Sequence, residues 1–289
     1  NACRFCYGSF RTFLRVAGYS DATLDRLEHD LHLGTDTRAD PGALHFAVEL
    51  SQGRFGEGTT AATLREQGYA DRAIREITGI AVLSALINRV ATMLAVPINE
   101  DAEALTGKWY FDVLQPVLRL FLKGWQRTRT PAAPPLAHDD VDGPFAPWTE
   151  RLAGTNVGHH VHSVVTQWMR NESALPLRTK LLILAVVARG LHCGALETRA
   201  IDLLVDRCEE TRRDVESAVG HLRGTVLDDR DAALLRLARE SIRYESGRIQ
   251  ETVRERTQSL SRAETIDAVA TLGLSNSLVR LRALAPLDA

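Results

Sequence analysis

Apolar residues recur at spacings of three and four along nearly every long segment of this chain. The run Leu44, Phe46, Ala47 and Leu50 is typical, and segments in which apolar and polar residues alternate are scarce. Spacings of three and four place apolar side chains on one face of an α-helix, whereas alternation places them on one face of a strand. The sequence therefore predicts an all-α fold.

Residues that cap helices indicate where these helices begin and end. Ser, Thr, Asn and Asp accept hydrogen bonds from the first amides of a helix, and Gly tolerates the left-handed backbone that often ends one. We expect helices to begin at Ser20–Asp21, Thr59–Thr60, Asp71, Asn99 or Asp101, Asp229 and Ser261, and to end at Gly18, Gly68 and Gly190.

A stretch rich in proline and glycine divides the chain. Residues 128–147 contain six such residues, namely Pro131, Pro134, Pro135, Gly143, Pro144 and Pro147. Proline blocks the propagation of a helix because it lacks an amide proton and clashes with the preceding turn. We expect a linker at 128–147, a first helical unit at 1–127 and a second at 148–289.

The two units resemble each other at a nearly constant offset. Adding 191 aligns Leu44, Phe46, Ala47 and Glu49 with Leu235, Leu237, Ala238 and Glu240, and Ser84 and Arg89 with Ser275 and Arg280. An offset of 190 places Cys3 opposite Cys193. This pattern predicts a tandem repeat of one helical unit. A helix over residues 177–191 precedes Cys193, and we expect its counterpart to precede Asn1 in a longer chain.

The charge of the chain is nearly balanced, with 35 Lys and Arg against 37 Asp and Glu and a net charge of −2. Without a dense basic run, we expect neither nucleic acid nor a membrane as a partner. The longest strongly apolar stretch, residues 181–188, is shorter than the ~20 residues that span a bilayer. His159 and His162 have a spacing compatible with metal binding, but no nearby carboxylate completes a set. We expect no metal and no other cofactor.

Cys3 and Cys6 form a Cys-x-x-Cys pair. At the first turn of a helix, unpaired amides and the helix dipole favour a thiolate, so the pKa of a cysteine there can fall below ~8.5. Two intervening residues let the sulfurs close a disulfide after one of them attacks an oxidant. The pair therefore indicates a two-electron redox site. Two buried structural thiols and half of a metal site are the alternatives, and a zinc site would need two further ligands.

The run from Asn1 to Phe10, followed by Leu14, Gly18 and Asp21, resembles the active-site helix of the alkyl hydroperoxidase D and carboxymuconolactone decarboxylase family. Residues 80–95 are similar to that family's closing helix, and residues 175–193 resemble the helix before its cysteine motif. The resemblance implies two tandem alkyl hydroperoxidase D-like helical repeats that form a homo-oligomer. It also implies an antioxidant activity in which paired cysteines reduce a peroxide substrate and an external thiol reductant regenerates them.

Carried over to this sequence, the resemblance makes Cys6 the thiolate that attacks the peroxide and Cys3 its resolving partner. Two histidines of the family are replaced by Phe5 and Phe10, and the position of its relay glutamate precedes Asn1. We therefore expect a weak peroxidase, with Ser9 as a candidate supporting hydroxyl. A catalytically silent binding or assembly module and a lyase acting on a small organic acid are the alternatives.

The second unit departs further from the motif. Leu196 takes the place of the second cysteine, Ala200 that of the histidine, and Lys180 or Leu181 that of the glutamate. We expect a degenerate copy that is kept for packing, in which Cys193 and Glu197 are the remnant of a site. We expect the protein to be cytoplasmic.

Overall fold

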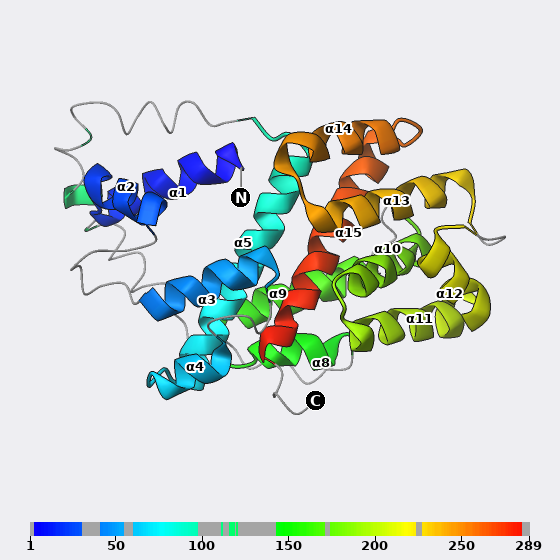
Figure 1. Ribbon diagram of the computed structural model, residues 1–289, viewed down its shortest axis with the longest axis horizontal. Helices are drawn as coiled ribbons and strands as arrows, with labels where there is room; N and C mark the ends of the chain where they lie inside the picture. The colour runs from blue at the N-terminus through cyan, green and yellow to red at the C-terminus, as the bar shows by residue number, and fades with distance from the viewer. Residues whose placement is uncertain are drawn as a thin grey trace.

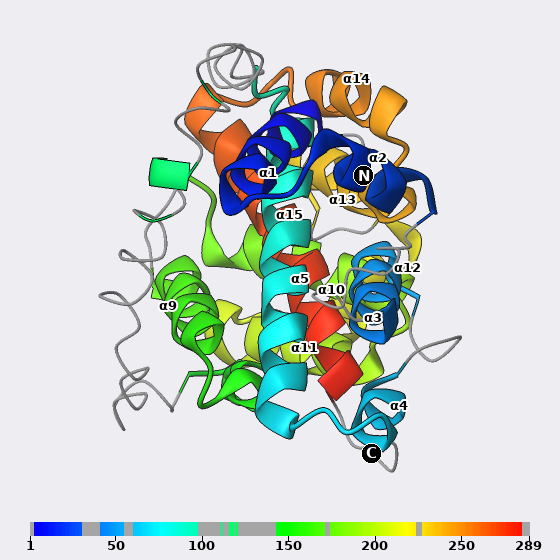
Figure 2. The same ribbon diagram turned by 90° about the vertical axis from the view of Figure 1, so that its left-hand side faces the viewer.

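The computed structural model describes residues 3–30, 41–54, 60–97, 111, 116–118, 120, 143–170, 174–223 and 227–284. Its elements in these ranges are helices, and no strand occurs among them. The predicted all-α fold is confirmed. Figures 1 and 2 show the helices from two directions at right angles.

The N-terminal helices are α1 (Arg4–Ala17), α2 (Asp21–Asp30), α3 (Pro41–Gln52), α4 (Ala61–Glu66) and α5 (Asp71–Met93). The C-terminal part begins with α8 (Ala146–Thr149), the 3-10 turn η2 (Glu150–Leu152), α9 (Asn156–Arg170) and α10 (Leu177–Gly190). It continues with α11 (Gly194–Cys208), α12 (Arg212–His221), α13 (Asp229–Arg243), α14 (Ser246–Arg256), α15 (Arg262–Arg280) and the 3-10 turn η3 (Leu281–Leu284).

The hydrophobic core is centred on α10 and α15. Residues 181–188 of α10 are each at most 2% exposed, so the longest apolar stretch of the sequence is a core segment. Helix α15 packs against α10 and against α5. Gly273 allows the close approach of α5, because a Cβ atom there would lie 2.9 Å from the side chains of Leu86 and Val90. Helix α5 is therefore held to the core along one of its faces.

Most of the predicted helix ends are confirmed. Helices α2, α5 and α13 begin at Asp21, Asp71 and Asp229. Thr60 and Ser261 cap α4 and α15, each through a capping box. Gly18 ends α1 with a φ of 102°, a backbone conformation that glycine adopts without strain. The starts expected at Asn99 or Asp101 lie outside the described residues.

The described end of the expected linker is packed against the core. Residues 128–142 lie outside the described part of the chain, whereas residues 143–147 lead into α8. Helix α8 begins before the linker was expected to end, because Pro147 fits the first turn of a helix. Phe145 is 1% exposed, and its ring lies 6.0 Å from the rings of Trp148 and Trp168.

Among the described residues, α5 is the one helix that is long and apolar enough to cross a bilayer. Half of its most apolar window is buried inside the fold, as in the core helix of a folded domain. This length and composition are therefore weak evidence for a membrane span.

Candidate functional site

Cys3 and Cys6 lie together at the N-terminal end of α1. Cys3 is the N-cap residue, and its Sγ accepts a hydrogen bond of 3.2 Å from the backbone amide of Cys6. Each cysteine is 4% exposed, and both pack with Phe5 and with Ala91 of α5. Figure 1 shows this end of α1 beside one end of α5. The two cysteines predicted to form a redox pair are thus neighbours in a buried position.

The thiol of Cys6 has a raised pKa. Burial is the largest cause, followed by the hydrogen bond and the charge of Cys3, and together they raise the pKa of Cys6 to about 12. The lowered pKa expected at a helix terminus is therefore wrong for Cys6. The physical reason is that the amide hydrogen bond at this helix end is donated to the sulfur of Cys3, while Cys6 is buried in the first turn.

Tyr244 lies near this cysteine pair, and Arg89 packs on Tyr244. The guanidinium carbon of Arg89, on α5, lies 4.4 Å from the centroid of the Tyr244 ring. Burial raises the pKa of Tyr244, and negative charge on Cys3 and Cys6 acts in the same direction. Burial lowers the pKa of Arg89 to about 10, so Arg89 is still a cation at neutral pH. The surroundings of the cysteine pair therefore include a neutral phenol, and a cation lies over the ring of that phenol.

Sequence reasoning did not find Tyr244 as a site residue. It follows the last residue of α13 and has a φ of 42°, which is uncommon for a bulky side chain. A strained backbone is often found at functional sites, but this strain is seen only in the structure and has no signal in the sequence. Arg89 was noted as a member of the repeat, and its contact with Tyr244 joins two residues that are far apart in the sequence.

Ser9 does not share the burial of the two sulfurs. It is exposed on α1, and Phe10 beside it is 49% exposed. In the structure, the described side chains that interact with the thiols from other elements come from α5 and from the turn between α13 and α14.

In the second unit, Cys193 occupies the N-cap position of α11 and is 6% exposed. Leu196, at the position of a second cysteine, is fully buried. Glu197 forms an ion pair of 2.7 Å with Arg189. Arg282 donates hydrogen bonds to the carbonyl oxygens of Leu191 and His192. Cys193 and Glu197 are therefore built into packing and ion-pair contacts.

His162 is buried, and its ring nitrogens lie 3.0 Å from the hydroxyl of Thr149 and 3.4 Å from that of Thr166. These contacts explain the histidine as part of the packing of α9 against α8. Within the described residues, no group of three or more His, Cys, Asp or Glu side chains could hold a metal ion.

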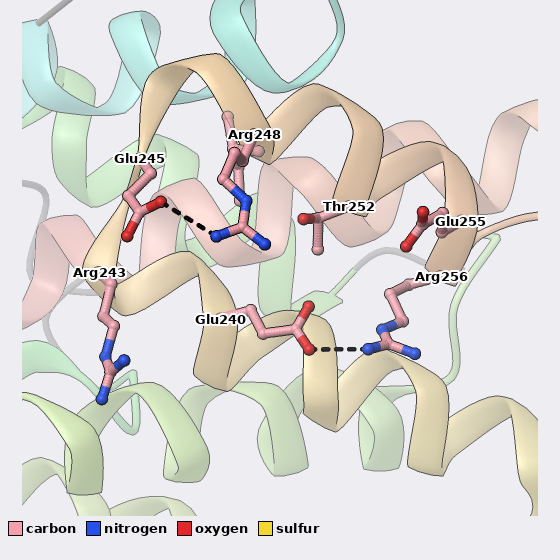
Figure 3. A pocket seen from close by; sticks show the side chains of 8 residues that line it. Glu240, Arg243, Glu245, Arg248, Thr252, Glu255 and Arg256 are labelled. Atoms are coloured by element: carbon pink, nitrogen blue, oxygen red, sulfur yellow. Dashed lines mark hydrogen bonds and ion pairs between the residues drawn. The ribbon is translucent and has the colours of Figure 1, made fainter.

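A surface pocket of about 300 Å³ lies between α13 and α14 (Figure 3). Its lining consists mainly of charged side chains, and ion pairs join Arg256 to Glu240 and Arg248 to Glu245. Arg243 and Glu245 line the pocket, whereas Tyr244 between them lies against Arg89. With acidic and basic groups already paired across it, the pocket offers no concentrated charge of either sign.

No protein-family model, curated protein or solved structure matches this chain. The resemblance to the alkyl hydroperoxidase D family therefore rests on the motif residues of the sequence.

Proposed function

We propose that this protein is a thiol-dependent peroxidase of the alkyl hydroperoxidase D kind, in which Cys3 and Cys6 reduce a peroxide. The observation that carries the proposal is the buried pairing of the two cysteines at a helix N-terminus, with Cys3 Sγ accepting the amide of Cys6. Such an arrangement keeps the two sulfurs within reach of each other, as the formation of a disulfide requires.

The raised pKa of Cys6 favours Cys3, rather than Cys6, as the attacking sulfur. Attack on the peroxide forms a sulfur–oxygen bond and breaks the oxygen–oxygen bond, which leaves a sulfenic acid on Cys3 and releases an alcohol after protonation. The Cys6 thiolate then displaces hydroxide from Cys3, so a disulfide and water are formed. Oxidation removes the negative charge of Cys3, which is one of the causes that raise the pKa of Cys6. Two equivalents of an external thiol reductant restore the dithiol.

Tyr244 supports this chemistry, and Arg89 positions it. The guanidinium of Arg89 lies over the Tyr244 ring and donates a hydrogen bond of 2.9 Å to the carbonyl of Ser241. The pKa of Tyr244 is raised, so its hydroxyl is protonated at neutral pH. This hydroxyl donates a hydrogen bond of 3.4 Å to the carbonyl of Asn88, and it leaves that carbonyl when it donates a proton to the departing alkoxide. As a proton donor, Tyr244 takes the place of the histidines that Phe5 and Phe10 replace.

We further propose that the fold is a tandem duplication, with residues 128–147 between the copies. Helices α2 and α12 both begin and both end 191 positions apart, and so do the starts of α5 and α15, at Asp71 and Arg262. The left-handed residues that end the helices correspond as well. Gly18 and Glu209 follow α1 and α11, and Gly53 and Tyr244 follow α3 and α13. Such agreement in helix ends supports a common origin of the two units.

Reciprocal contacts between the units support the same proposal. Arg89 donates to the carbonyl of Ser241 near the end of α13, and Arg280, its counterpart, donates to the carbonyl of Ser51 near the end of α3. Across the contact of α5 and α15, Gly273 meets Leu86 and Ser277 donates to the carbonyl of Val82. At the offset of 191, Gly273 is equivalent to Val82 and Ser277 is equivalent to Leu86. The contact of Gly273 with Leu86 is therefore equivalent to the contact of Ser277 with Val82, as at a two-fold interface.

The roles of the cysteines are tested with the matched variants Cys3→Ser and Cys6→Ser. Each is treated with a small excess of hydrogen peroxide in the presence of dimedone, and the sulfenic acid adducts are located by peptide mass spectrometry. We expect an adduct on Cys3 in the Cys6→Ser variant and little on Cys6 in the Cys3→Ser variant. Unmodified protein treated without dimedone should contain a Cys3–Cys6 disulfide that dithiothreitol reverses.

An adduct on Cys6 in the Cys3→Ser variant, with little on Cys3 in the Cys6→Ser variant, would show that Cys6 attacks the peroxide, as the family resemblance implies. Absence of both the disulfide and the adducts would instead leave a catalytically silent helical protein. Cys193 and Cys208 are present in both variants and act as internal controls for unspecific oxidation.

A further inference from the structure

Asn88 and Thr92 of α5 each carry a buried polar atom that has no partner. The Oδ1 atom of Asn88 and the hydroxyl oxygen of Thr92 are buried, and among the described residues neither atom has a hydrogen-bond partner. The side chain of Thr92 lies inside the fold, since this residue is 4% exposed. Burial of a polar group without a partner is costly. Two such atoms one helical turn apart therefore indicate that this part of the fold receives a polar partner.

Thr92 differs in this respect from another threonine of the same helix. The hydroxyl of a helical threonine often donates to the carbonyl four residues before it, and Thr78 donates to the carbonyl of Ile74 at 2.8 Å. The carbonyl four residues before Thr92 is that of Asn88, and it accepts the hydroxyl of Tyr244 at 3.4 Å. The phenol thus takes the acceptor that a threonine at this position commonly uses, which leaves the Thr92 hydroxyl available.

The side chains of Asn88 and Thr92 lie between the cysteine pair and Tyr244. Ala91 packs with the cysteine pair, and the guanidinium of Arg89 lies over the Tyr244 ring. Successive residues of a helix are rotated by about 100°, so Asn88 and Thr92 come between these two residues around α5. Figure 1 shows α1 on one side of the upper end of α5 and the start of α14 on the other.

Electrostatic effects on Tyr244 agree with this placement. Burial raises the pKa of Tyr244, and the nearby hydroxyl of Thr92 lowers it from beyond hydrogen-bond distance. Negative charge on the cysteine pair acts on the same phenol. The thiols, Thr92 and Tyr244 therefore lie close together.

The hydrogen-bonding capacity of these groups defines the partner that fits. The Oδ1 atom of Asn88 only accepts, the hydroxyl of Thr92 accepts as well as donates, and the protonated phenol of Tyr244 donates. A matching partner therefore has two polar hydrogens and an oxygen that accepts. Hydrogen peroxide has an O–H group on each of two adjacent oxygens and meets both requirements. An alkyl hydroperoxide has a single O–H group, so it leaves one of the two atoms of α5 without a donor.

We propose that Asn88 and Thr92 bind hydrogen peroxide beside the cysteine pair and make this protein selective for hydrogen peroxide over alkyl hydroperoxides. This inference rests on the proposed function and names the substrate of that same site. The Cys3 thiolate attacks one oxygen and is oxidised to a sulfenic acid, while the oxygen–oxygen bond breaks and its electron pair leaves with hydroxide. Tyr244 protonates the hydroxide to water and regains its proton from solvent.

The test measures the rate constants of Cys3–Cys6 disulfide formation with hydrogen peroxide and with tert-butyl hydroperoxide, by rapid quenching with a maleimide and peptide mass spectrometry. Thr92→Val removes the hydroxyl and keeps the shape of the side chain, whereas Thr92→Ser keeps the hydroxyl. We expect Thr92→Val to lower the rate constant for hydrogen peroxide by about tenfold and that for tert-butyl hydroperoxide clearly less. Thr92→Ser should keep the selectivity of the unmodified protein.

Thr78→Val is the matched control, because Thr78 is a buried threonine of α5 whose hydroxyl has a partner. It should leave the selectivity between the two peroxides unchanged, and it should lower the unfolding temperature because a buried hydrogen bond is lost. Thr92→Val should instead keep or raise the unfolding temperature, since it removes a buried hydroxyl without a partner. This second measurement does not depend on peroxide reduction.

Equal selectivity of Thr92→Val and the unmodified protein would overturn this inference and leave the proposed peroxidase function intact. A fall in the unfolding temperature of Thr92→Val as large as that of Thr78→Val would overturn it too, because the Thr92 hydroxyl would then have a structural partner. If neither peroxide oxidises the unmodified protein, the proposed function itself is wrong and the inference is wrong with it.

Discussion

At the scale of single residues, the cysteine pair is asymmetric although the two side chains are chemically identical. Cys3 receives an amide hydrogen bond because it is the N-cap, whereas Cys6 lies within the first turn and is penalised by burial. The motif predicted that the two sulfurs would be neighbours. It did not predict Tyr244, which is far away in sequence and reaches the site through the packing of α14 against α5. Local spacing identifies a pair within one turn, but it carries no information on such long-range neighbours.

The raised pKa of Cys6 leads to a prediction about alkaline stability. Because the pKa rises from 9.0 to about 12 on folding, the fold favours the protonated thiol. The contribution of Cys6 to stability is then complete below pH 9.0 and is lost as the pH rises towards about 12. Urea unfolding at about pH 8 and about pH 10.5 should therefore show a larger loss of stability for the unmodified protein than for Cys6→Ala. Parallel losses in the two proteins would contradict the raised pKa.

At the scale of helices, much of the fold was predictable because helix ends are determined locally. Capping side chains lie within three residues of the amides that they bind, as at Thr60 and Ser261, so the sequence contains both partners. Helix α8 begins at Ala146, inside the range 128–147 where a linker was expected, since proline both blocks a preceding helix and fits the first turn of a new one. The exposure of the apolar side chain of Ile80 on α5 was not predictable, because helical periodicity alone does not tell which apolar face is covered.

The N-cap role of Cys3 gives a prediction at this scale. Serine retains an oxygen that accepts the Cys6 amide, whereas alanine leaves that amide without a partner, at a cost of about 1 kcal/mol. We expect hydrogen exchange in the first turns of α1 to be faster in Cys3→Ala than in Cys3→Ser, while neither variant forms a disulfide. Equal exchange in the two variants would show that the sulfur of Cys3 does not cap the helix.

At the scale of the whole molecule, the contacts of Arg89 and Arg280 join the two units. Each guanidinium is buried and donates to a carbonyl near the end of a helix in the other unit, where the last carbonyls lack partners within the helix. A cation at a helix C-terminus is also favoured by the helix dipole. Loss of either arginine therefore affects a helix in the other half of the chain. These contacts couple the unfolding of the two halves.

This coupling predicts that the chain unfolds in one cooperative transition and that Arg280→Ala weakens both units. The substitution leaves a cavity and removes the side-chain hydrogen bonds to the carbonyls of Ser51 and Asn276, so the free energy of unfolding should fall by about 3 kcal/mol. Arg280→Met keeps most of the side-chain volume and removes a buried guanidinium, whose pKa burial lowers to about 9. We therefore expect Arg280→Met to lower the free energy of unfolding clearly less than Arg280→Ala does. Calorimetry should record a single peak for all three proteins, with hydrogen exchange in α3 and in α15 accelerated together by Arg280→Ala. Two separate peaks, of which Arg280→Ala moves only one, would mean that the units fold independently and that the reciprocal arginine contacts do not hold them together.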